Sequence, residues 1–247
     1  MLGFLAKVML VTSLVLIPLS VWHRSELPPA AKMLPALDSD PRQTATSARP
    51  FDIGARGLHY TITPRFAYDL SGMVVSTHDA ASSSDTFHGE MKDYVNVVDL
   101  CVVWGSTARE EIYKEYSFSN NDTFCFGAPK SEKSRAIDIP TMSNNHLVTN
   151  SPTLAAELRK VRPGDQVRFA GYLISYSRQI ENNGTISRNT STVRTDTGDG
   201  ACEVVYVNEF EILRPYQNQW ETGLKAGVGL LVLSLLTLIY AYGREKI

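Results

Sequence analysis

The stretch SPTLAAELRKVRPGDQVRFAGYLISY, Ser151 to Tyr176, reads as a short helix, a hard stop and a buried strand. Ser151 is a favourable N-cap because its hydroxyl accepts a first-turn N–H, and Pro152 suits the first helical position. Apolar residues then recur at helical spacing until Pro163 and the following glycine end the helix. We therefore expect a helix over about 151–162, followed by a strand of β-branched and aromatic residues.

Four further regions have the composition of strands. They are Phe66–Thr77, Val95–Trp104, the pair Tyr113–Phe118 and Thr123–Phe126, and Glu203–Leu213. In order, this gives three strand regions, one helix and two more strands. That order resembles the oligonucleotide/oligosaccharide-binding (OB) barrel, which has a helix between its third and fourth strands. The resemblance covers roughly 66–213. It implies a mainly β fold, a small OB-like antiparallel β-barrel with one internal helix; a small antiparallel sandwich is the alternative.

Both ends of the chain are strongly apolar. Val8–Trp22 follows a lysine and lacks a small-x-small cleavage site, so it favours an uncleaved signal anchor over a removed signal peptide. Ala226–Tyr242 carries no charge and, with 223–225, approaches the ~20 residues that span a bilayer. Arg244 and Lys246 follow it and indicate a cytoplasmic C-terminus. We expect the β domain to be flanked by N- and C-terminal transmembrane helices.

These segments divide the chain into six parts. We expect a transmembrane signal anchor at 1–22, a Pro-rich linker at 23–59, an extracytoplasmic β-barrel-like domain at 60–215, a juxtamembrane segment at 216–222, a transmembrane helix at 223–243 and a cytoplasmic tail at 244–247. Pro-rich sequence disfavours helix and ladder pairing, so the linker is expected to act as an extended spacer. A poorly packed terminal arm is equally consistent with that composition.

Two short stretches are similar to stretches in uncharacterised bacterial membrane-anchored envelope proteins. They are SNNHL at Ser143–Leu147 and RTDTGDGACE at Arg194–Glu203. The resemblance implies a bacterial inner-membrane protein whose central domain is periplasmic or extracellular. It implies no activity and no catalytic residues.

The chain has three cysteines, too few for a disulfide scaffold but enough for one bridge. Cys101 and Cys125 are expected on neighbouring second and third strands, so we favour this pair. Cys202 with either partner is the alternative, as are three buried free thiols. A bridge in an oxidising compartment would contribute on the order of 3 kcal/mol.

Charge and motifs exclude several function classes. The 247-residue chain has a net charge of −2, which gives no reason to expect a nucleic-acid partner. It contains no nucleophile elbow, phosphate loop or dinucleotide fingerprint, and we expect no cofactor. Asp196-Thr197-Gly198 matches the three-letter core of aspartic proteases, but it occurs once and lacks the apolar residues before it. A Gly-rich turn entering the last strand is the simpler interpretation.

Two groups of residues are candidate metal ligands. Asp196, Asp199 and Glu203 cluster around two glycines, as oxygen ligands of a hard cation do, although without EF-hand spacing. His78 and His88 lie in one polar loop and are able to approach each other, but the sequence lacks an HExxH spacing. A plain solvated loop is the simpler interpretation of each group.

The combination of two anchors, a folded middle and no catalytic constellation predicts a non-enzymatic envelope protein that binds a protein or membrane-complex partner. Candidate ligand-binding residues are Tyr172, Tyr176, Arg178, His146 and Asp196. A peptide- or glycan-binding module is one alternative. A hydrolase-like envelope enzyme is another, and it would require Asp196, Asp199 or Glu203 to converge with His146 in one pocket.

Overall fold

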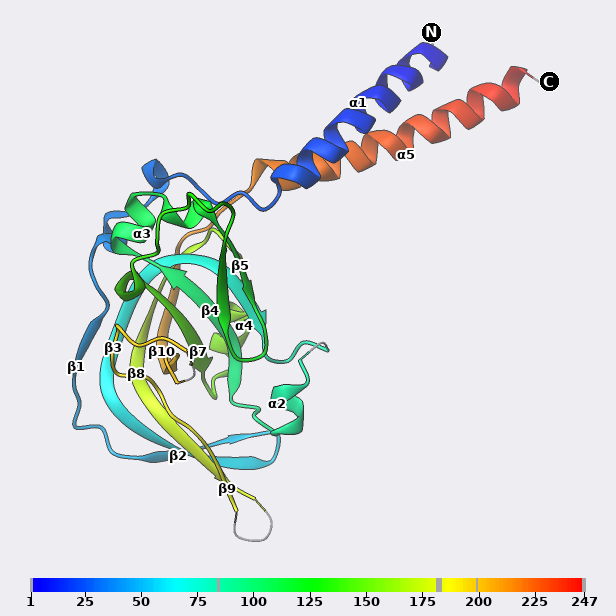
Figure 1. The fold of residues 1–247 in the computed structure, drawn as a ribbon. Coiled ribbons are helices and arrows are strands. Elements are labelled where there is room, and N and C mark those ends of the chain that lie inside the picture. Colours follow the sequence, from blue (N-terminus) through cyan, green and yellow to red (C-terminus); the bar gives the residue numbers. More distant parts are fainter. Residues whose placement is uncertain (1, 84, 181–183, 199, 246–247) are drawn as a thin grey trace. The chain divides into compact units, whose positions relative to one another are not determined.

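The computed structural model describes residues 2–83, 85–180, 184–198 and 200–245. The chain forms two compact units, Met1–Leu27 with Gln217–Ile247, and Pro28–Tyr216. Helices α1 (Leu2–His23) and α5 (Gln219–Glu245) make up the first unit, and a curled sheet dominates the second (Figure 1). Each unit is described by itself below.

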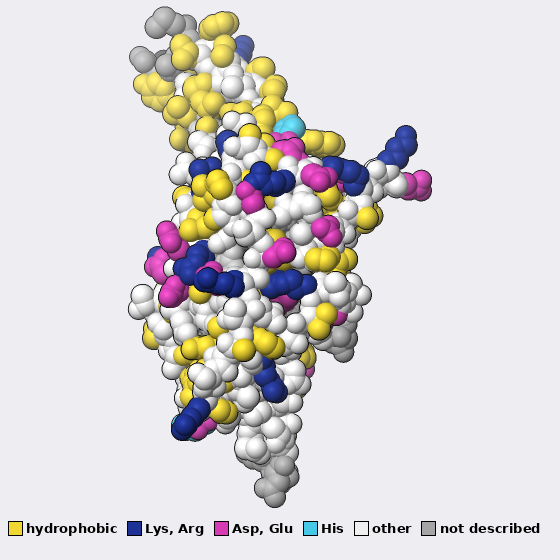
Figure 2. All heavy atoms as spheres, turned by 90° about the vertical axis from the view of Figure 1, so that its left-hand side faces the viewer, with side chains coloured by type: hydrophobic (Ala, Val, Ile, Leu, Met, Phe, Trp, Pro, Cys, Tyr) yellow, Lys and Arg dark blue, Asp and Glu magenta, His cyan; other side chains and the backbone are white. Residues whose placement is uncertain are grey.

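The two helices of the first unit pack against each other along small residues. A Cβ at Gly227 would lie 2.9 Å from Ile17 Cγ1, and Ser234 Oγ donates a 2.8 Å hydrogen bond to the Ala6 carbonyl. Hydrophobic side chains cover the outer surface of this helix pair (Figure 2). Windows within Gly3–His23 and Gln219–Gly243 have mean hydropathies of 2.2 and 2.0, so both helices are long and apolar enough to cross a membrane.

The sheet of the second unit has eight strands. They are β1 (Arg42–Ala45), β2 (Phe51–Ala55), β3 (Leu58–Asp79), β4 (Asn96–Val103), β7 (Met142–Val148), β8 (Gln166–Gln179), β9 (Thr185–Arg188) and β10 (Glu203–Arg214). The pairing order is β1-β3-β4-β7-β10-β8-β9, and β2 pairs with β3. The long β3 pairs with β8 through Thr61–Met73 and with β4 through Met73–Asp79. The sheet is therefore partly ringed.

The structure confirms long apolar helices at both ends of the chain but corrects the expected antiparallel barrel. The sheet is mixed, because β10 runs parallel to β7 while its other pairings are antiparallel. Parallel neighbours need a long connection. Here α4 (Pro152–Leu158), β8 and β9 separate the two strands in the chain.

Helix α4 begins as expected and ends sooner. Ser151 Oγ accepts a hydrogen bond from the Leu154 N–H at 3.3 Å, and Pro152 is the first helical residue. The helix stops at Leu158 rather than near 162, yet Leu158 and Val161 both enter the hydrophobic core. Residues 151–176 thus place one helix and one strand against the same hydrophobic core.

The expected third strand lies elsewhere. Strands β5 (Tyr116–Asn120) and β6 (Cys125–Pro129) form a separate two-stranded sheet. In the main sheet the strand that pairs with β4 is instead β7, which carries SNNHL. The remaining short elements are α2 (Phe87–Glu90), α3 (Gly105–Arg109) and the 3-10 turns Ala30–Lys32, Pro35–Asp38, Ile112–Glu115 and Ile139–Thr141. The sequence did not predict β7 as a strand of the sheet, because its two asparagines give the segment a low strand propensity.

The proline-rich stretch differs from an extended spacer. From Pro28 onward it belongs to the sheet unit, where Leu37 is 1% exposed and Arg42–Ala45 pairs with β3. Gln166 Oε1 also accepts a 2.7 Å hydrogen bond from the Leu34 N–H. The prolines lie outside the paired segment Arg42–Ala45, so they do not prevent this ladder.

Candidate active or binding pocket

A pocket of about 800 Å³ lies between two connections of the sheet. One wall comes from the β3–β4 connection, including Phe87 and residues 91–93. The other comes from residues 186–189, from Gly200 and Cys202 before β10, and from Val204 in β10. Phe124, from the β5–β6 turn, adds an aromatic side chain. Side chains of β7 and β8 complete the lining.

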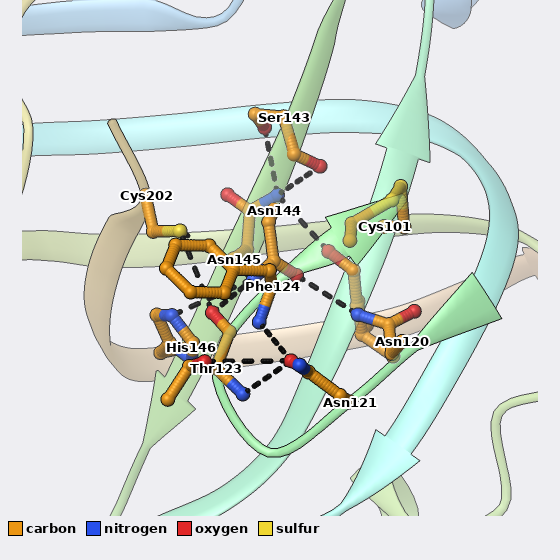
Figure 3. Close-up of a disulfide and its surroundings, with 12 residues drawn as sticks. Cys101, Asn120, Asn121, Thr123, Phe124, Ser143, Asn144, Asn145, His146 and Cys202 are labelled. Carbon is orange, nitrogen blue, oxygen red and sulfur yellow. Dashed lines mark hydrogen bonds between the residues drawn. A yellow bond between two sulfur atoms is a disulfide. The ribbon is translucent and has the colours of Figure 1, made fainter. Parts of the chain in front are cut away.

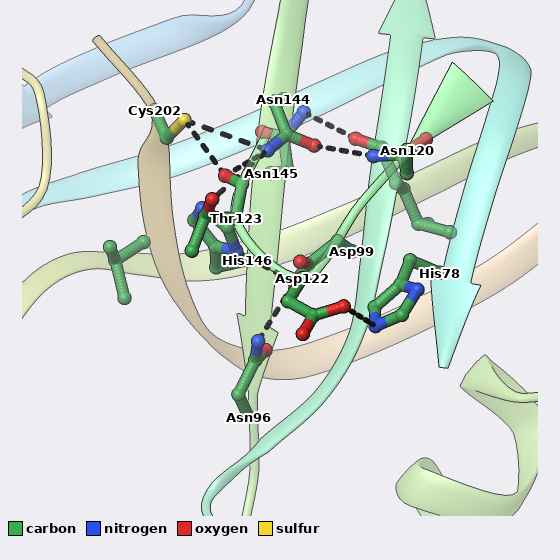
Figure 4. Close-up of polar contacts among 12 residues, drawn as sticks. His78, Asn96, Asp99, Asn120, Asp122, Thr123, Asn144, Asn145, His146 and Cys202 are labelled. Carbon is green, nitrogen blue, oxygen red and sulfur yellow. Dashed lines mark hydrogen bonds and ion pairs between the residues drawn. The ribbon is translucent and has the colours of Figure 1, made fainter. Parts of the chain in front are cut away.

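His146 presents one ring nitrogen to this pocket and the other to a buried carboxylate. It faces Asp99 across β7 and β4, where the two residues are register partners, and its Nδ1 lies 2.7 Å from Asp99 Oδ1. Asn96 Nδ2 donates to the same oxygen at 2.8 Å (Figure 4). Burial lowers the pKa of His146 and so keeps the ring uncharged. Burial opposes ionisation of Asp99, but the contacts with His146 and Asn96 outweigh it and lower the pKa of Asp99.

Arg188, at the end of β9, joins this pair to a second histidine. Its Nη2 donates to His146 Nε2 at 2.8 Å and its Nη1 to His88 Nε2 at 3.3 Å. Asp93 Oδ2 lies 3.7 Å from Nη1. One guanidinium is therefore held between two imidazoles and one carboxylate.

The pocket lining also includes a phenol, Tyr176, which is the register partner of Arg188, and a second guanidinium, that of Arg178. The Tyr176 hydroxyl donates to Asp93 Oδ2 at 2.5 Å, and burial raises the pKa of Tyr176. Arg178 Nη2 donates to the Met91 carbonyl at 3.0 Å. Within the described part of the chain, Arg178 forms no ion pair with a carboxylate.

The bridge Cys101–Cys125 confirms the expected pairing and joins β4 to the β5–β6 hairpin (Figure 3). The expected reason for the pairing was wrong, because Cys125 lies outside the main sheet. Beside the bridge, Asn144 Nδ2 lies 3.5 Å from both His146 Nε2 and the free Cys202 Sγ. Burial raises the pKa of the Cys202 thiol, so the thiol form is favoured.

The structure brings together only some of the predicted site residues. His146, Tyr176 and Arg178 line the pocket, whereas Tyr172 lines a separate shallow hollow on the sheet surface. Asp196 lies in the connection before β10 and accepts a 2.6 Å hydrogen bond from Ser191 Oγ.

Of the three predicted cation ligands, Asp196 and Glu203 are described and Asp199 is not, so the cation site stays a prediction. Glu203 is 6% exposed at the start of β10 and is a register partner of Asn145. Neither Asp196 nor Glu203 lines the pocket with His146. Asp199 lies outside the described residues. Three other side chains, His78, Asp85 and His88, bring potential metal-ligand atoms within 4.8 Å of one another.

Sequence reasoning missed Asp99, Asp93 and Arg188. Asp99 had a readable signal, because an aspartate inside NVVDLCVV is a charge in an apolar strand and needs a buried partner. Arg188 had no such signal, since it stands in a polar excursion whose short strand β9 pairs only through four residues. No family model, curated protein or solved structure matches this chain.

Proposed function

We propose that this chain is a membrane-anchored, non-enzymatic binding protein whose pocket holds a ligand with an anionic group on an apolar body. One observation carries the proposal: the guanidinium groups of Arg178 and Arg188 line the same pocket as an uncharged His146. Guanidinium groups bind carboxylates and phosphates through paired hydrogen bonds.

The charges of the pocket favour an anion. Among its described lining residues, the cations are Lys92, Arg178 and Arg188, and Asp93 is the one carboxylate. His146 adds no charge, because burial lowers its pKa. With the buried, ionised Asp99 behind His146 included, three cations face two carboxylates and leave an excess of one positive charge, which an anionic ligand would neutralise.

The remaining wall favours an apolar body. Phe87, Phe124 and Ile186 line the pocket, and Phe87 is 38% exposed. Ligand pockets in proteins combine such apolar lining with a few placed polar groups. A ligand that buries its apolar part here would contribute about 25 cal/mol for each Å² removed from water.

The position of the pocket supports the OB-like interpretation of the sheet. The cyclic pairing β3-β4-β7-β10-β8-β3 and the helix between β7 and β8 follow the OB strand order. In OB folds the connections after the first and fourth strands bind extended ligands. The β3–β4 and β8–β10 connections are the equivalent segments here, so a peptide or glycan bearing an anionic group is one form of the proposed ligand.

We further propose that the sheet unit lies outside the bacterial inner membrane, anchored by both helices and docked to a protein partner of the membrane. Two observations support this location. The helices are long and apolar enough to span a bilayer, and the Cys101–Cys125 bridge is typical of an oxidising compartment.

A hydrolase-like function is the competing proposal, and the pocket favours it less. The Asp99–His146 pair has the geometry of a base and its orienting group, and Cys202 lines the same pocket. However, the thiol contacts Asn144 and the Thr123 carbonyl instead of the imidazole, and burial raises its pKa. A thiol in these surroundings is not activated for attack.

Thermal stability in the presence of three six-carbon probes tests the proposal. Hexanoate, hexanol and hexylamine share an apolar body and differ in charge. We expect hexanoate to raise the melting temperature of the detergent-solubilised full chain and the other two to have little effect. Arg178→Gln should weaken hexanoate binding about tenfold or more, since a hydrogen bond to a charged group contributes about 1.5–3 kcal/mol. Phe87→Ala should weaken binding of the apolar part.

Arg159→Gln is the matched control, because Arg159 pairs with Asp79 outside the pocket and its side chain is 38% exposed. This variant should retain wild-type hexanoate binding. Equal stabilisation by hexanoate and hexylamine, or equal losses in Arg178→Gln and Arg159→Gln, would refute an anion site at this pocket.

A further inference from the structure

Two histidines surround one buried carboxylate near the end of β3: His78 is in β3, Asp85 in the connection that follows and His88 in α2. None of the three lines the pocket. Asp85 Oδ2 lies 2.7 Å from His78 Nε2 and 2.6 Å from His88 Nδ1. The Asp85 side chain is 0% exposed, and the His88 and His78 side chains are 1% and 12% exposed. Both imidazoles thus converge on a single oxygen at the edge of the interior.

A second carboxylate approaches from another part of the chain. Asp122, in the β5–β6 turn, has its Oδ1 3.8 Å from His78 Nε2 (Figure 4). Its Oδ2 accepts hydrogen bonds from the backbone N–H groups of Thr86 and Phe87, both at 3.2 Å. These bonds fix the carboxylate against the start of α2.

We propose that His78 Nε2, Asp85 Oδ2, His88 Nδ1 and Asp122 Oδ1 bind one divalent transition-metal ion of the zinc class. Two imidazoles and two carboxylates form a four-ligand set of the kind that holds tetrahedral zinc, whereas Ca²⁺ and Mg²⁺ prefer all-oxygen sites. The two negative charges balance the dication. None of the four ligand residues lines the pocket, but the site borders it, because His88 Nε2 accepts from Arg188 Nη1 and Asp122 Oδ2 accepts from the Phe87 N–H.

The distances fit such an ion after a small adjustment. Bonds of about 2.0–2.2 Å in a tetrahedral zinc site separate neighbouring ligand atoms by about 3.3 Å. The two contacts of Asp85 would widen from 2.7 and 2.6 Å, and the His78–Asp122 contact would shorten from 3.8 Å. Each of these three changes is under 1 Å. Asp122 lies outside the group of His78, Asp85 and His88, whose ligand atoms are all within 4.8 Å of one another, so its side chain has to move farther to complete the site.

Metal binding also has a defined consequence for His88. Its Nε2 lies 2.9 Å from Asn96 Nδ2 and 3.3 Å from Arg188 Nη1; both are donors, so without metal the ring proton is on Nδ1. An ion at Nδ1 replaces that proton, and the ring then carries its proton on Nε2. Asn96 Oδ1 is buried and has no partner among the described residues, so rotation of this amide supplies the acceptor. That rotation takes the Asn96 donor away from Asp99 Oδ1, and Arg188 Nη1 loses its acceptor at His88 Nε2, so metal binding breaks both contacts.

Zinc stoichiometry of the full chain tests the proposal. Untagged protein in detergent would be stripped with EDTA, dialysed against ZnCl2 and measured by mass spectrometry of the metal. We expect one zinc per chain in the wild type. His78→Gln and Asp122→Asn should each bind zinc at least about tenfold more weakly. His59→Gln, which changes an exposed histidine outside the cluster, should bind like the wild type.

Cobalt supplies a readout that does not depend on stability. CoCl2 added to the stripped wild type should give the visible absorption of a tetrahedral cobalt site, and His78→Gln should lose it. Circular dichroism would establish that each variant is folded, and Asp122→Asn keeps the shape of the side chain it replaces. Absence of stoichiometric zinc from the wild type, or wild-type zinc binding by both folded variants, would overturn the proposal.

Discussion

At the scale of single residues, charged and polar groups lie inside strands that otherwise carry valines. Glu203 begins β10 with a side chain that is 6% exposed, and its Oε2 has no hydrogen-bond partner among the described residues. Desolvation by burial raises the pKa of Glu203 to about 8. The folded protein therefore holds a proton on Glu203 at neutral pH that the unfolded chain releases.

This raised pKa predicts a pH-dependent stability. Between the ordinary value of 4.5 and about 8, the folded state binds more protons than the unfolded state, so the free energy of unfolding falls as pH rises. The slope from this group is at most about 1.4 kcal/mol per pH unit. Glu203→Gln should remove this dependence. Urea denaturation of both proteins at several pH values between 5 and 9 checks it; a constant difference in stability would contradict it.

At the scale of elements, close approach of strands requires glycine at one position of β8. Gly171 pairs with Tyr68 of β3 and Val207 of β10, and an added Cβ would lie 1.9 Å from the Tyr206 carbonyl oxygen. The sequence predicted β8, but not this contact, because the contact depends on a bulge in the pairing with β10.

Gly171→Ala should therefore destabilise the sheet unit by at least about 1–3 kcal/mol, the usual cost of overpacking. Gly54→Ala is the matched control, since its nearest neighbour, the Leu58 carbonyl oxygen, would be 3.8 Å from the added Cβ. The midpoint of urea denaturation measures both variants. Similar midpoints for the two variants would show that the strands do not approach as described.

The Cys101–Cys125 disulfide links β4 covalently to the β5–β6 hairpin across a sequence separation of 24. Closing a loop of this length contributes about 3 kcal/mol by restricting the unfolded chain. Cys101→Ala combined with Cys125→Ala should lower the free energy of unfolding by about that amount. Cys202→Ser keeps the bridge and should retain most of the free energy of unfolding under non-reducing conditions. An unchanged free energy of unfolding of the wild type after addition of reductant would contradict this prediction.

At the scale of the whole molecule, hydropathy and strand composition predicted the two long helices, helix α4 and strands β3, β4, β8 and β10, but neither β7 nor which residues meet. His146 and Asp99 are 47 residues apart, and Arg188 is 42 residues beyond His146. Their meeting depends on the register of β4 with β7 and of β8 with β9, and a slip of one residue would turn every side chain to the other face. The Cys101–Cys125 pair was one of three possible pairings and was favoured for a reason that the structure contradicts, because Cys125 lies outside the main sheet.

The helix pair gives a prediction at the same scale. Gly227 faces Ile17, whereas an added Cβ at Gly229 would meet no atom within 4 Å. Gly227→Leu should separate the helices, and Gly229→Leu should not, because small residues permit close helix packing in membranes. Disulfide crosslinking between cysteines introduced at Ala6 and Ser234 measures this separation. Equal crosslinking in both variants would contradict the packing.

The central claim is that the pocket between the two connections binds an anion with an apolar body. Methyl-resolved NMR of the full chain in detergent, titrated with hexanoate, tests it directly. We expect saturable shifts of the methyl signals of Ile186 and Met91, because both residues line the pocket. The methyl signals of Ile139 and Ile212, which do not line it, should stay unchanged. Unchanged Ile186 and Met91 signals, or equal shifts at all four residues, would contradict it.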